Sequence, residues 1–250
     1  MDILYIHGKG FSNWHYNELR YSLRGLDKFG QHVDRIFIAG WCPPFVNRDT
    51  VTYIPVRDEP GACKHYNIQR CIEQAVSQTD IGDEFLLSSD DHFYIAPTDF
   101  DAYPFYWRGV ELPTSVNPKD PNMDYQTTLY STRRVLEACG LPCHHLAWHG
   151  NTHFSRRIWE SDRMVLMRRL ALTMPEGCEP TCLIGNLRVA TEGVPLVARE
   201  DCKIGRDTSK EDFEKKIQGR EVVSATDNIE RSVLAPFLQN LLPHKSKWEL

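Results

Sequence analysis

The chain has 250 residues, of which 41% are hydrophobic and 25% charged, and a formal net charge of −5 at pH 7. This size and composition predict one soluble α/β domain over residues 1–250. The negative charge disfavours a protein that coats nucleic acid nonspecifically. No apolar run reaches the roughly eighteen residues of a membrane helix. The first residues lack the basic start of a signal peptide, so we expect a cytoplasmic protein.

Strands and helices alternate through the first 95 residues. Apolar runs predict four strands, at residues 2–6, 35–39, 51–56 and 84–87. A helix with Leu19, Leu23 and Leu26 on one face is predicted between the first two strands, and a second amphipathic helix around residues 68–76 between the last two. This order predicts an α/β fold with a mostly parallel central sheet that is flanked by helices.

The second half of the chain has a less regular pattern. The sequence predicts a long loop at 98–121, helices near 125–140, 155–172, 209 and 228–242, a strand at 143–148 and an excursion at 193–205. Ser209 and Asp212 form a capping box that opens one of these helices. No linker or repeat divides the chain, so we expect one domain.

An acidic pair stands at the end of the fourth predicted strand. The apolar run ends in Ser88-Ser89-Asp90-Asp91-His92, and a second apolar run follows at once. In open α/β sheets, ligands collect at the carboxyl ends of strands. Two adjacent carboxylates repel each other unless a cation binds them, and a divalent cation could bridge them to a diphosphate. Asp90, Asp91 and His92 are therefore the predicted catalytic residues.

The eight cysteines are expected to be reduced thiols in a cytoplasmic protein. Two pairs, Cys139 with Cys143 and Cys178 with Cys182, have the spacing and the intervening proline that a structural zinc site can use. The alternative is that the two pairs never meet, with Cys139 at a helix end and Cys143 in a strand.

The densest basic cluster consists of Arg156, Arg157, Arg163, Arg168 and Arg169. In an acidic protein this cluster is the best candidate for a contact with nucleic-acid phosphates. The alternative is the solvated face of an amphipathic helix.

Several short motifs follow one another along the chain. They are Asn17-Glu18-Leu19-Arg20-Tyr21-Ser22-Leu23-Arg24, the run 36–40 with a proline pair after it, the run 54–56, Lys64 with Asn67, the Ser-Asp-Asp-His run at 89–92, and the C-terminal stretch 242–249. Together they resemble the stealth-type sugar-phosphate transferases and related glycosyltransferases of phages and bacteria. Ser89 is a departure, because the family usually has Asn there.

The resemblance implies a GT-A fold, with a nucleotide-sugar-binding half in residues 1–95 and an acceptor half with C-terminal helices in residues 96–250. It implies a nucleotide-sugar donor, such as a UDP-sugar, and a divalent metal, Mn²⁺ or Mg²⁺. Asp91 would bind the metal, and Asp90 the metal or the donor's ribose. The donor-binding residues would be Asn17, Glu18, Arg20, Arg24, Lys64, Asn67 and Asp90.

Sugar transferases of this fold often take a further metal ligand, a histidine, from the C-terminal half. Of His144, His145, His149 and His153, we expect His149, because it follows a predicted strand and precedes a predicted helix. The aromatic segment Tyr106-Trp107-Arg108 is the predicted acceptor site, since its rings could stack on a sugar or on a flipped base.

Three functions are compatible with these observations. The first is glycosyl transfer to a hydroxyl, with 5-hydroxymethylated pyrimidine in phage DNA favoured over a cell-surface glycan by the compact size and the phage-like relatives. The second is stealth-type transfer of hexose 1-phosphate to a cell-surface polysaccharide, with attack at phosphorus. The third is a non-catalytic sugar-binding phage protein, which the intact Asp90 and Asp91 disfavour.

Overall fold

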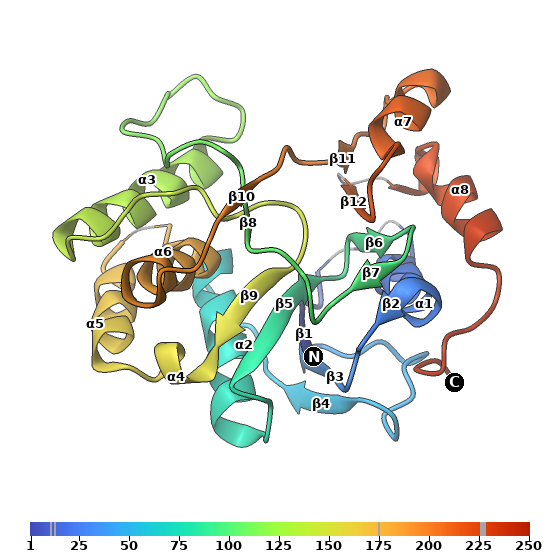
Figure 1. Cartoon of the computed structure of the whole chain (residues 1–250), viewed down its shortest axis with the longest axis horizontal. Helices are drawn as coiled ribbons and strands as arrows, with labels where there is room; N and C mark the ends of the chain where they lie inside the picture. Colours follow the sequence, from blue (N-terminus) through green and yellow to red (C-terminus); the bar gives the residue numbers. More distant parts are fainter. Residues whose placement is uncertain (11, 13, 175, 226–228) are drawn as a thin grey trace.

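A five-stranded sheet forms the centre of the molecule (Figure 1). The structure is a computed structural model that describes residues 1–10, 12, 14–174, 176–225 and 229–250, without the side chain of Glu230. The strand order is β4-β3-β1-β5-β9. The parallel strands are β1 (Asp2–His7), β3 (Ile36–Gly40), β4 (Thr52–Pro55) and β5 (Glu84–Ser89), and β9 (Thr152–Ser155) pairs antiparallel with β5. The prediction of a mostly parallel central sheet is confirmed.

The register of the sheet brings the carboxyl ends of three strands to one edge. His7 at the end of β1 pairs with Gly40 of β3, and Ile6 pairs with Ser89 of β5. Gly40 has φ +112°, and a Cβ there would lie 2.3 Å from the His7 carbonyl oxygen, so this close approach requires glycine. The residues that follow Ser89 therefore leave the sheet beside His7.

Helices pack on both faces of the sheet. On one face, α1 (Asn17–Phe29) buries Leu19 and Leu23 against Ile3 and Tyr5 of β1, whereas Leu4 points into the opposite core cluster. That second cluster joins the sheet to helices α2 (Lys64–Gln78), α3 (Met123–Ala138), α4 (Arg156–Trp159), α5 (Asp162–Ala171) and α6 (Pro180–Glu192). Within the described residues, none of the helices has both the length and the apolar character that a membrane crossing requires.

Three small sheets surround the central one. They pair β6 (His92–Tyr94) with β12 (Val222–Ala225) and β12 with β11 (Lys203–Ile204), β8 (Tyr106–Trp107) with β10 (Val197–Ala198), and β2 (Gly30–Gln31) with β7 (Thr98–Asp99). The C-terminal part adds α7 (Lys210–Ile217), a 3₁₀ turn (Ile229–Arg231) and α8 (Leu234–Leu241). Because β6 begins directly after Asp91, this arrangement brings β11 close to the acidic turn.

Several predictions for the second half were wrong. The strand expected at 143–148 does not form, and His144 makes only an isolated bridge to Glu111. The apolar residues of that segment are buried by packing, because Leu146 and Trp148 are 0% and 7% exposed. The helix expected at 155–172 is divided into α4 and α5, because Ser161 caps a new helix by accepting a hydrogen bond from the Met164 N–H.

Two further differences concern helix ends. Helix α6 was not predicted, although Pro180 at its first turn and Gly193 after its last residue are typical start and stop residues. The last helix begins at Leu234, later than expected, and its predicted start at Asn228 lies outside the described residues. The capping box is confirmed, since Ser209 accepts a hydrogen bond from the Asp212 N–H at the start of α7.

Candidate active site

The acidic turn lies at the carboxyl edge of the sheet. The buried strand β5 ends at Ser89, and Asp90 and Asp91 form the turn before β6. Their side chains are 37% and 29% exposed, so both carboxylates remain accessible. The structure thus keeps the predicted pair together at the edge where ligands of open α/β sheets bind.

The charge of this pair is only partly compensated. Burial in the turn, together with the adjacent Asp91, raises the pKa of Asp90 to about 6, although Lys64 acts in the opposite direction. The Ser89 hydroxyl donates to Asp90 Oδ1 over 3.3 Å, and His7 Nε2 lies 3.5 Å from Oδ2. Since burial lowers the pKa of His7, this imidazole is a weak counter-charge at neutral pH. A cation at the turn would relieve this repulsion.

His92 is a buried residue that contacts the acidic turn. Its side chain is 8% exposed, and its Nδ1 accepts a hydrogen bond from the Ser89 backbone N–H. Burial lowers its pKa to about 4, so the ring is neutral at physiological pH. Its Nε2 lies 4.0 Å from Asp91 Oδ1. The geometry shows His92 holding the acidic turn, and the predicted catalytic role stays a prediction.

His149 belongs to a network around Asp201. Its Nδ1 donates to Asp201 Oδ2 over 2.9 Å, and its backbone N–H donates to Oδ1 over 2.9 Å. The guanidinium of Arg108 lies 2.6 Å from the same Oδ2. On the other side of the ring, Lys203 Nζ lies 3.2 Å from Nε2. Asp201 and Lys203 were not predicted, because they lie more than fifty residues from His149 in the sequence and belong to no recognisable motif.

The other candidate histidines are engaged elsewhere. His144 pairs with Glu111, and His153 donates to the Tyr103 carbonyl. Burial lowers the pKa of His145 to about 4, and its Nε2 faces Arg108. Of the four histidines that the sequence offered, His149 remains the candidate at the site.

A cavity of about 750 Å³ opens along this edge of the sheet. Its wall combines the end of β5, the start of α2, the segment around His149 and the start of α6. The polar residues that line it include Lys64, His65, Ser88, Ser89, His149, Glu179 and Lys203. A ligand with several negative charges would meet two lysines and His149 beside the acidic turn.

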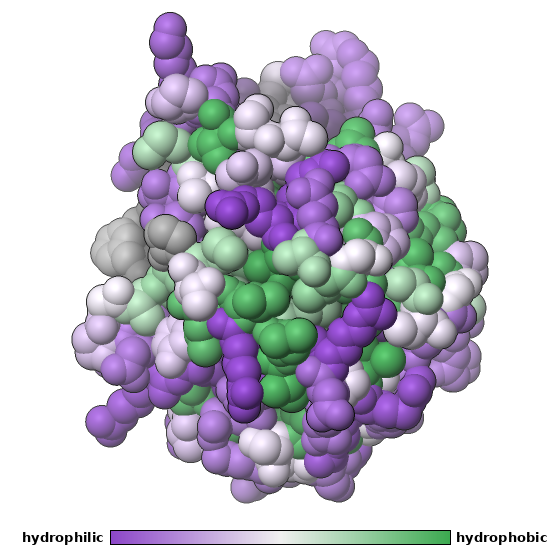
Figure 2. All heavy atoms as spheres, turned by 90° about the vertical axis from the view of Figure 1, so that its left-hand side faces the viewer, coloured by the Kyte–Doolittle hydropathy of each residue, from purple (hydrophilic) through white to green (hydrophobic). Residues whose placement is uncertain are grey.

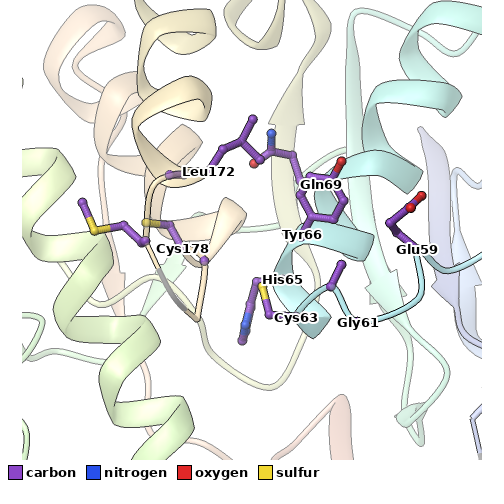
Figure 3. A pocket seen from close by; sticks show the side chains of 12 residues that line it. Glu59, Gly61, Cys63, His65, Tyr66, Gln69, Leu172 and Cys178 are labelled. Carbon is purple, nitrogen blue, oxygen red and sulfur yellow. The ribbon is translucent and has the colours of Figure 1, made fainter.

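A second cavity, of about 480 Å³, adjoins the first (Figure 3). The two cavities share Cys63 and His65 at the start of α2. Figure 3 shows Tyr66 and Gln69 on the α2 side of the second cavity and Leu172 and Cys178 on the other. The molecular face over α3 and α5 carries a cluster of hydrophobic side chains with hydrophilic ones around it (Figure 2).

The acidic turn fits a divalent cation with few protein ligands. Within the part of the chain that the structure describes, no group of three or more His, Cys, Asp or Glu residues could hold a metal ion. Asp90, Asp91 and His149 are therefore not a preassembled set of three ligands. Carboxylate oxygens suit Mg²⁺ and Mn²⁺, and Mg²⁺ usually binds through one or two carboxylates plus substrate phosphates and water. The two carboxylates of the turn match that mode.

The cysteine pairs do not form the zinc site that their spacing allowed. The described residues offer no cysteine cluster suited to a metal, and all eight cysteines are free. Burial raises the pKa of Cys178 to about 12 and also raises that of Cys182, whereas zinc binds thiolates. Cys139 ends α3, as the alternative interpretation expected.

The predicted donor-binding residues fall into two groups. Lys64 lines the large cavity. Glu18 lies near Asp90, and the negative charge of Asp90 contributes to the raised pKa of Glu18. Asn17 is the first residue of α1, next to Glu18. Asn67 instead accepts a hydrogen bond from the Glu59 N–H, so it holds the loop before α2.

Arg20 and Arg24 are bound to the C-terminal segment. Arg24 donates to both carboxylate oxygens of Glu249, over 2.7 and 3.0 Å, and to the Leu242 carbonyl. Arg20 Nε lies 3.3 Å from the same carboxylate, and its guanidinium covers the Phe45 ring. The structure therefore gives Arg24 a structural partner in place of the donor contact that the resemblance implied.

The predicted acceptor segment, residues 106–108, packs beside the segment 144–148 and the His149 network. Tyr106 accepts a hydrogen bond from Arg199 and packs against Trp148, and Trp107 packs edge-on against His144. Only Arg108 reaches the His149 network, through Asp201. The acceptor role of Tyr106 and Trp107 stays a prediction.

The arginine cluster lies at the opposite edge of the sheet. The backbone N–H groups of Arg156 and Arg157 donate to Asp83, directly before β5. Strand β5 has six residues, so the cluster and the acidic turn are separated by about 20 Å at a rise of about 3.3 Å per residue. Its arginines also have partners: Arg156 with Glu160, Arg157 with Glu192, Arg168 with Glu73, and Arg163 with the Cys139 carbonyl.

Comparison with known proteins shows the fold class. No protein-family model matches the sequence, and a search of curated proteins gives no match either. Among solved structures, the chain is similar to an active-site mutant of LgtC, with a TM-score of 0.52 and 11% sequence identity. The similarity covers 96% of this chain and 95% of that one. It confirms a GT-A-like fold over nearly the whole chain.

Proposed function

We propose that this chain is a glycosyltransferase that takes a nucleotide sugar, with a UDP-sugar as the first choice, as its donor. The likeness of its fold to LgtC, a glycosyltransferase, supports this class of enzyme. The motifs that resemble the stealth-type and phage transferases support the same kind of donor. Because many functions share one fold, the site must carry the proposal.

The observation that carries the proposal is the accessible Asp90–Asp91 pair at the carboxyl end of β5. The neighbouring residues Ser88, Ser89 and His92 line a cavity of about 750 Å³ that two lysines also line. When a divalent metal is bound there, it offsets the negative charge of the departing diphosphate. Asp91 and Asp90 would hold that metal, with the donor phosphates completing its shell.

The chain's own cations have the same task as the metal. The ammonium groups of Lys64 and Lys203 would stabilise the charge that develops on the diphosphate, because both residues line the cavity. Asp201 orients both His149 and Arg108, so these donors are also preorganised.

The acceptor proposed here is a saccharide hydroxyl. In the arginine cluster that would have held DNA phosphates, Arg156, Arg157 and Arg168 pair with acidic residues. Arg156 and Arg157 lie at the other edge of the sheet. These two arginines, which the sequence singled out for binding the phosphates of hydroxymethylated DNA, therefore do not lie beside the acidic turn. DNA is therefore included as one of the acceptors in the experiment below.

The test is incubation of the purified protein with a panel of nucleotide sugars, with Mn²⁺ or with a chelator. We expect metal-dependent release of nucleoside diphosphate from one donor. Plain DNA, hydroxymethylated DNA and an oligosaccharide mixture serve as acceptors, and mass spectrometry identifies the product. A product about eighty daltons heavier than the glycoside would indicate sugar-phosphate transfer, and no turnover of any donor would refute the proposal.

A further inference from the structure

Three acidic residues, Asp124, Glu176 and Glu179, line the large cavity, and Glu179 lies on the side of α6. Glu179 directly precedes this helix, and its side chain is 13% exposed. Its Oε1 accepts a hydrogen bond from Thr181 Oγ1 over 3.1 Å, and its Oε2 lies 3.3 Å from His65 Nε2. Glu179 could not be selected from the sequence, because it lies between two cysteines in a segment without a predicted element.

Glu179 does not serve the helix that it precedes. A residue at this position usually turns its side-chain oxygen to the N–H groups of the first turn. The Glu179 side chain makes no such capping hydrogen bond. It points instead to His65 and the cavity, so capping does not explain a buried carboxylate here.

Three helices fix the position of this carboxylate. His65 belongs to the first turn of α2, and its Nδ1 lies 3.4 Å from Thr128 Oγ1 of α3. Thr128 in turn donates to the Asp124 and Glu176 carbonyls. Each carboxylate oxygen has about two acceptor sites, and the two neighbours use one on each oxygen. Within the described residues, Thr181 and His65 are the neighbours given for these oxygens, which leaves acceptor sites for a ligand in the cavity.

The charges around Glu179 keep it ionised. Burial raises its pKa, but the hydrogen bond and charge of His65, with a contribution from Lys64, outweigh this effect, and the pKa lies below its ordinary value. Lys64 also lowers the pKa of Asp90. Lys64 and Glu179 line the same cavity, and the charge of Lys64 favours the ionised form of both Glu179 and Asp90.

We propose that Glu179 is the general base that takes the proton of the acceptor hydroxyl, with His65 as its positioning residue. This inference rests on the proposed glycosyltransferase function. The acceptor O–H bond breaks, and its proton moves to a Glu179 oxygen while the acceptor oxygen bonds to the anomeric carbon. The bond from that carbon to the diphosphate oxygen breaks, and the diphosphate leaves with the electron pair. The configuration at the anomeric carbon is inverted.

The first test uses the Glu179→Gln variant, which keeps the shape and both hydrogen-bonding neighbours. With the UDP-sugar that the wild type consumes fastest, we expect kcat for hydrolysis and transfer to fall about a hundredfold to ten-thousandfold. The affinity for UDP and the melting temperature should stay unchanged. The control Glu214→Gln removes the same charge from an exposed position of α7, outside the cavity, and should keep kcat within about threefold. His65→Gln should shift the pH profile.

A second variant separates a base from a structural residue. Azide needs no deprotonation, so it should restore donor cleavage by Glu179→Ala and yield a glycosyl azide. Wild-type kcat in Glu179→Gln, absence of azide rescue in a folded Glu179→Ala protein, or retention of configuration in the wild-type product would each overturn the role of Glu179. A wild-type protein that consumes no nucleotide sugar would overturn the proposed function itself, which is a distinguishable result.

Discussion

At the scale of single residues, Asp90 and Asp91 have different surroundings although they are adjacent. Asp90 faces His7 and Lys64, whereas Asp91 lies over the buried ring of His92. We expect Asp91→Asn to lower kcat about a thousandfold or more, because a direct metal ligand contributes several kcal/mol to the stabilisation of the transition state. Steady-state kinetics with Mn²⁺ measures this loss, and the melting temperature should be unchanged.

The control for this change is Asp49→Asn, in an exposed turn, which should leave kcat and metal dependence as in the wild type. If Asp91→Asn keeps more than a tenth of the wild-type rate, Asp91 does not belong to the metal site. The same kinetics at several Mn²⁺ concentrations distinguish a weaker metal affinity from a lost catalytic contact.

At the scale of elements, α1 is fixed to the C-terminal segment by Arg24 and Glu249. The Glu249 carboxylate is 2% exposed, and Arg24 is its two-fold donor. We expect Arg24→Ala to lower the free energy of unfolding by about 3–5 kcal/mol. Among the described residues, it leaves the buried Glu249 carboxylate with Arg20 as its one cationic partner, beside the N–H and hydroxyl of Ser246. Nucleotide affinity should be unchanged. Chemical denaturation and calorimetry measure these two quantities.

Lys28→Ala is the comparison for that variant, since Lys28 is exposed and donates only to the Leu241 carbonyl. Lys28→Ala should lower the free energy of unfolding by about 1 kcal/mol or less. A large decrease in nucleotide affinity for Arg24→Ala, without a loss of stability, would return Arg24 to the donor site that the resemblance implied.

Helix α1 also passes unusually close to β6. A Cβ on Gly25 would lie 2.4 Å from the Tyr94 carbonyl oxygen. Alanine normally stabilises a helix by about 1 kcal/mol relative to glycine, but here we expect Gly25→Ala to destabilise the fold by about 1–3 kcal/mol. In α6, the Cβ added by Gly185→Ala would meet the end of the Leu146 side chain instead of backbone. The free energy of unfolding should therefore fall less for Gly185→Ala than for Gly25→Ala. An equal or greater stability of Gly25→Ala would contradict this account.

The elements of the first half could be predicted because each has a clear local period. Strands β1 and β3 are continuous apolar runs, as parallel strands buried on both faces require. The segment 143–148 shows the limit of that reasoning. Its apolar residues are buried in the same way as those of a strand, but its backbone pairs only briefly, through one bridge and hydrogen bonds between residues 143–145 and 108–112, outside the central sheet. The hydrophobic pattern of a segment indicates which side chains are buried, but it does not by itself show whether the backbone pairs with another strand.

At the scale of the whole molecule, the same limit applies to the site. Asp90 and Asp91 could be predicted, because an acidic pair directly after an apolar strand is a local pattern. Asp201, Lys203 and Glu179 could not, because only the packing of α6 and β11 against the sheet brings them to the cavity. The contact of Arg24 with Glu249 could not be predicted either, because the two residues are 225 positions apart in the sequence. The donor contact of Arg24 stays a prediction.

The position of the arginine cluster leads to the last prediction. Arg156 and Arg157 lie at the amino end of β5, paired with Glu160 and Glu192, and Asp91 lies beyond the other end of this strand. We therefore expect the double variant Arg156→Gln and Arg157→Gln to keep wild-type kcat and KM for donor hydrolysis and for every acceptor. The rate of transfer should also change little between low and physiological salt, because few phosphate contacts mean few released counterions. Kinetics on hydroxymethylated DNA across a salt series measures both. A rate that falls steeply with salt, together with a higher KM for DNA in the double variant, would show that DNA is held by this edge and would restore it as the acceptor.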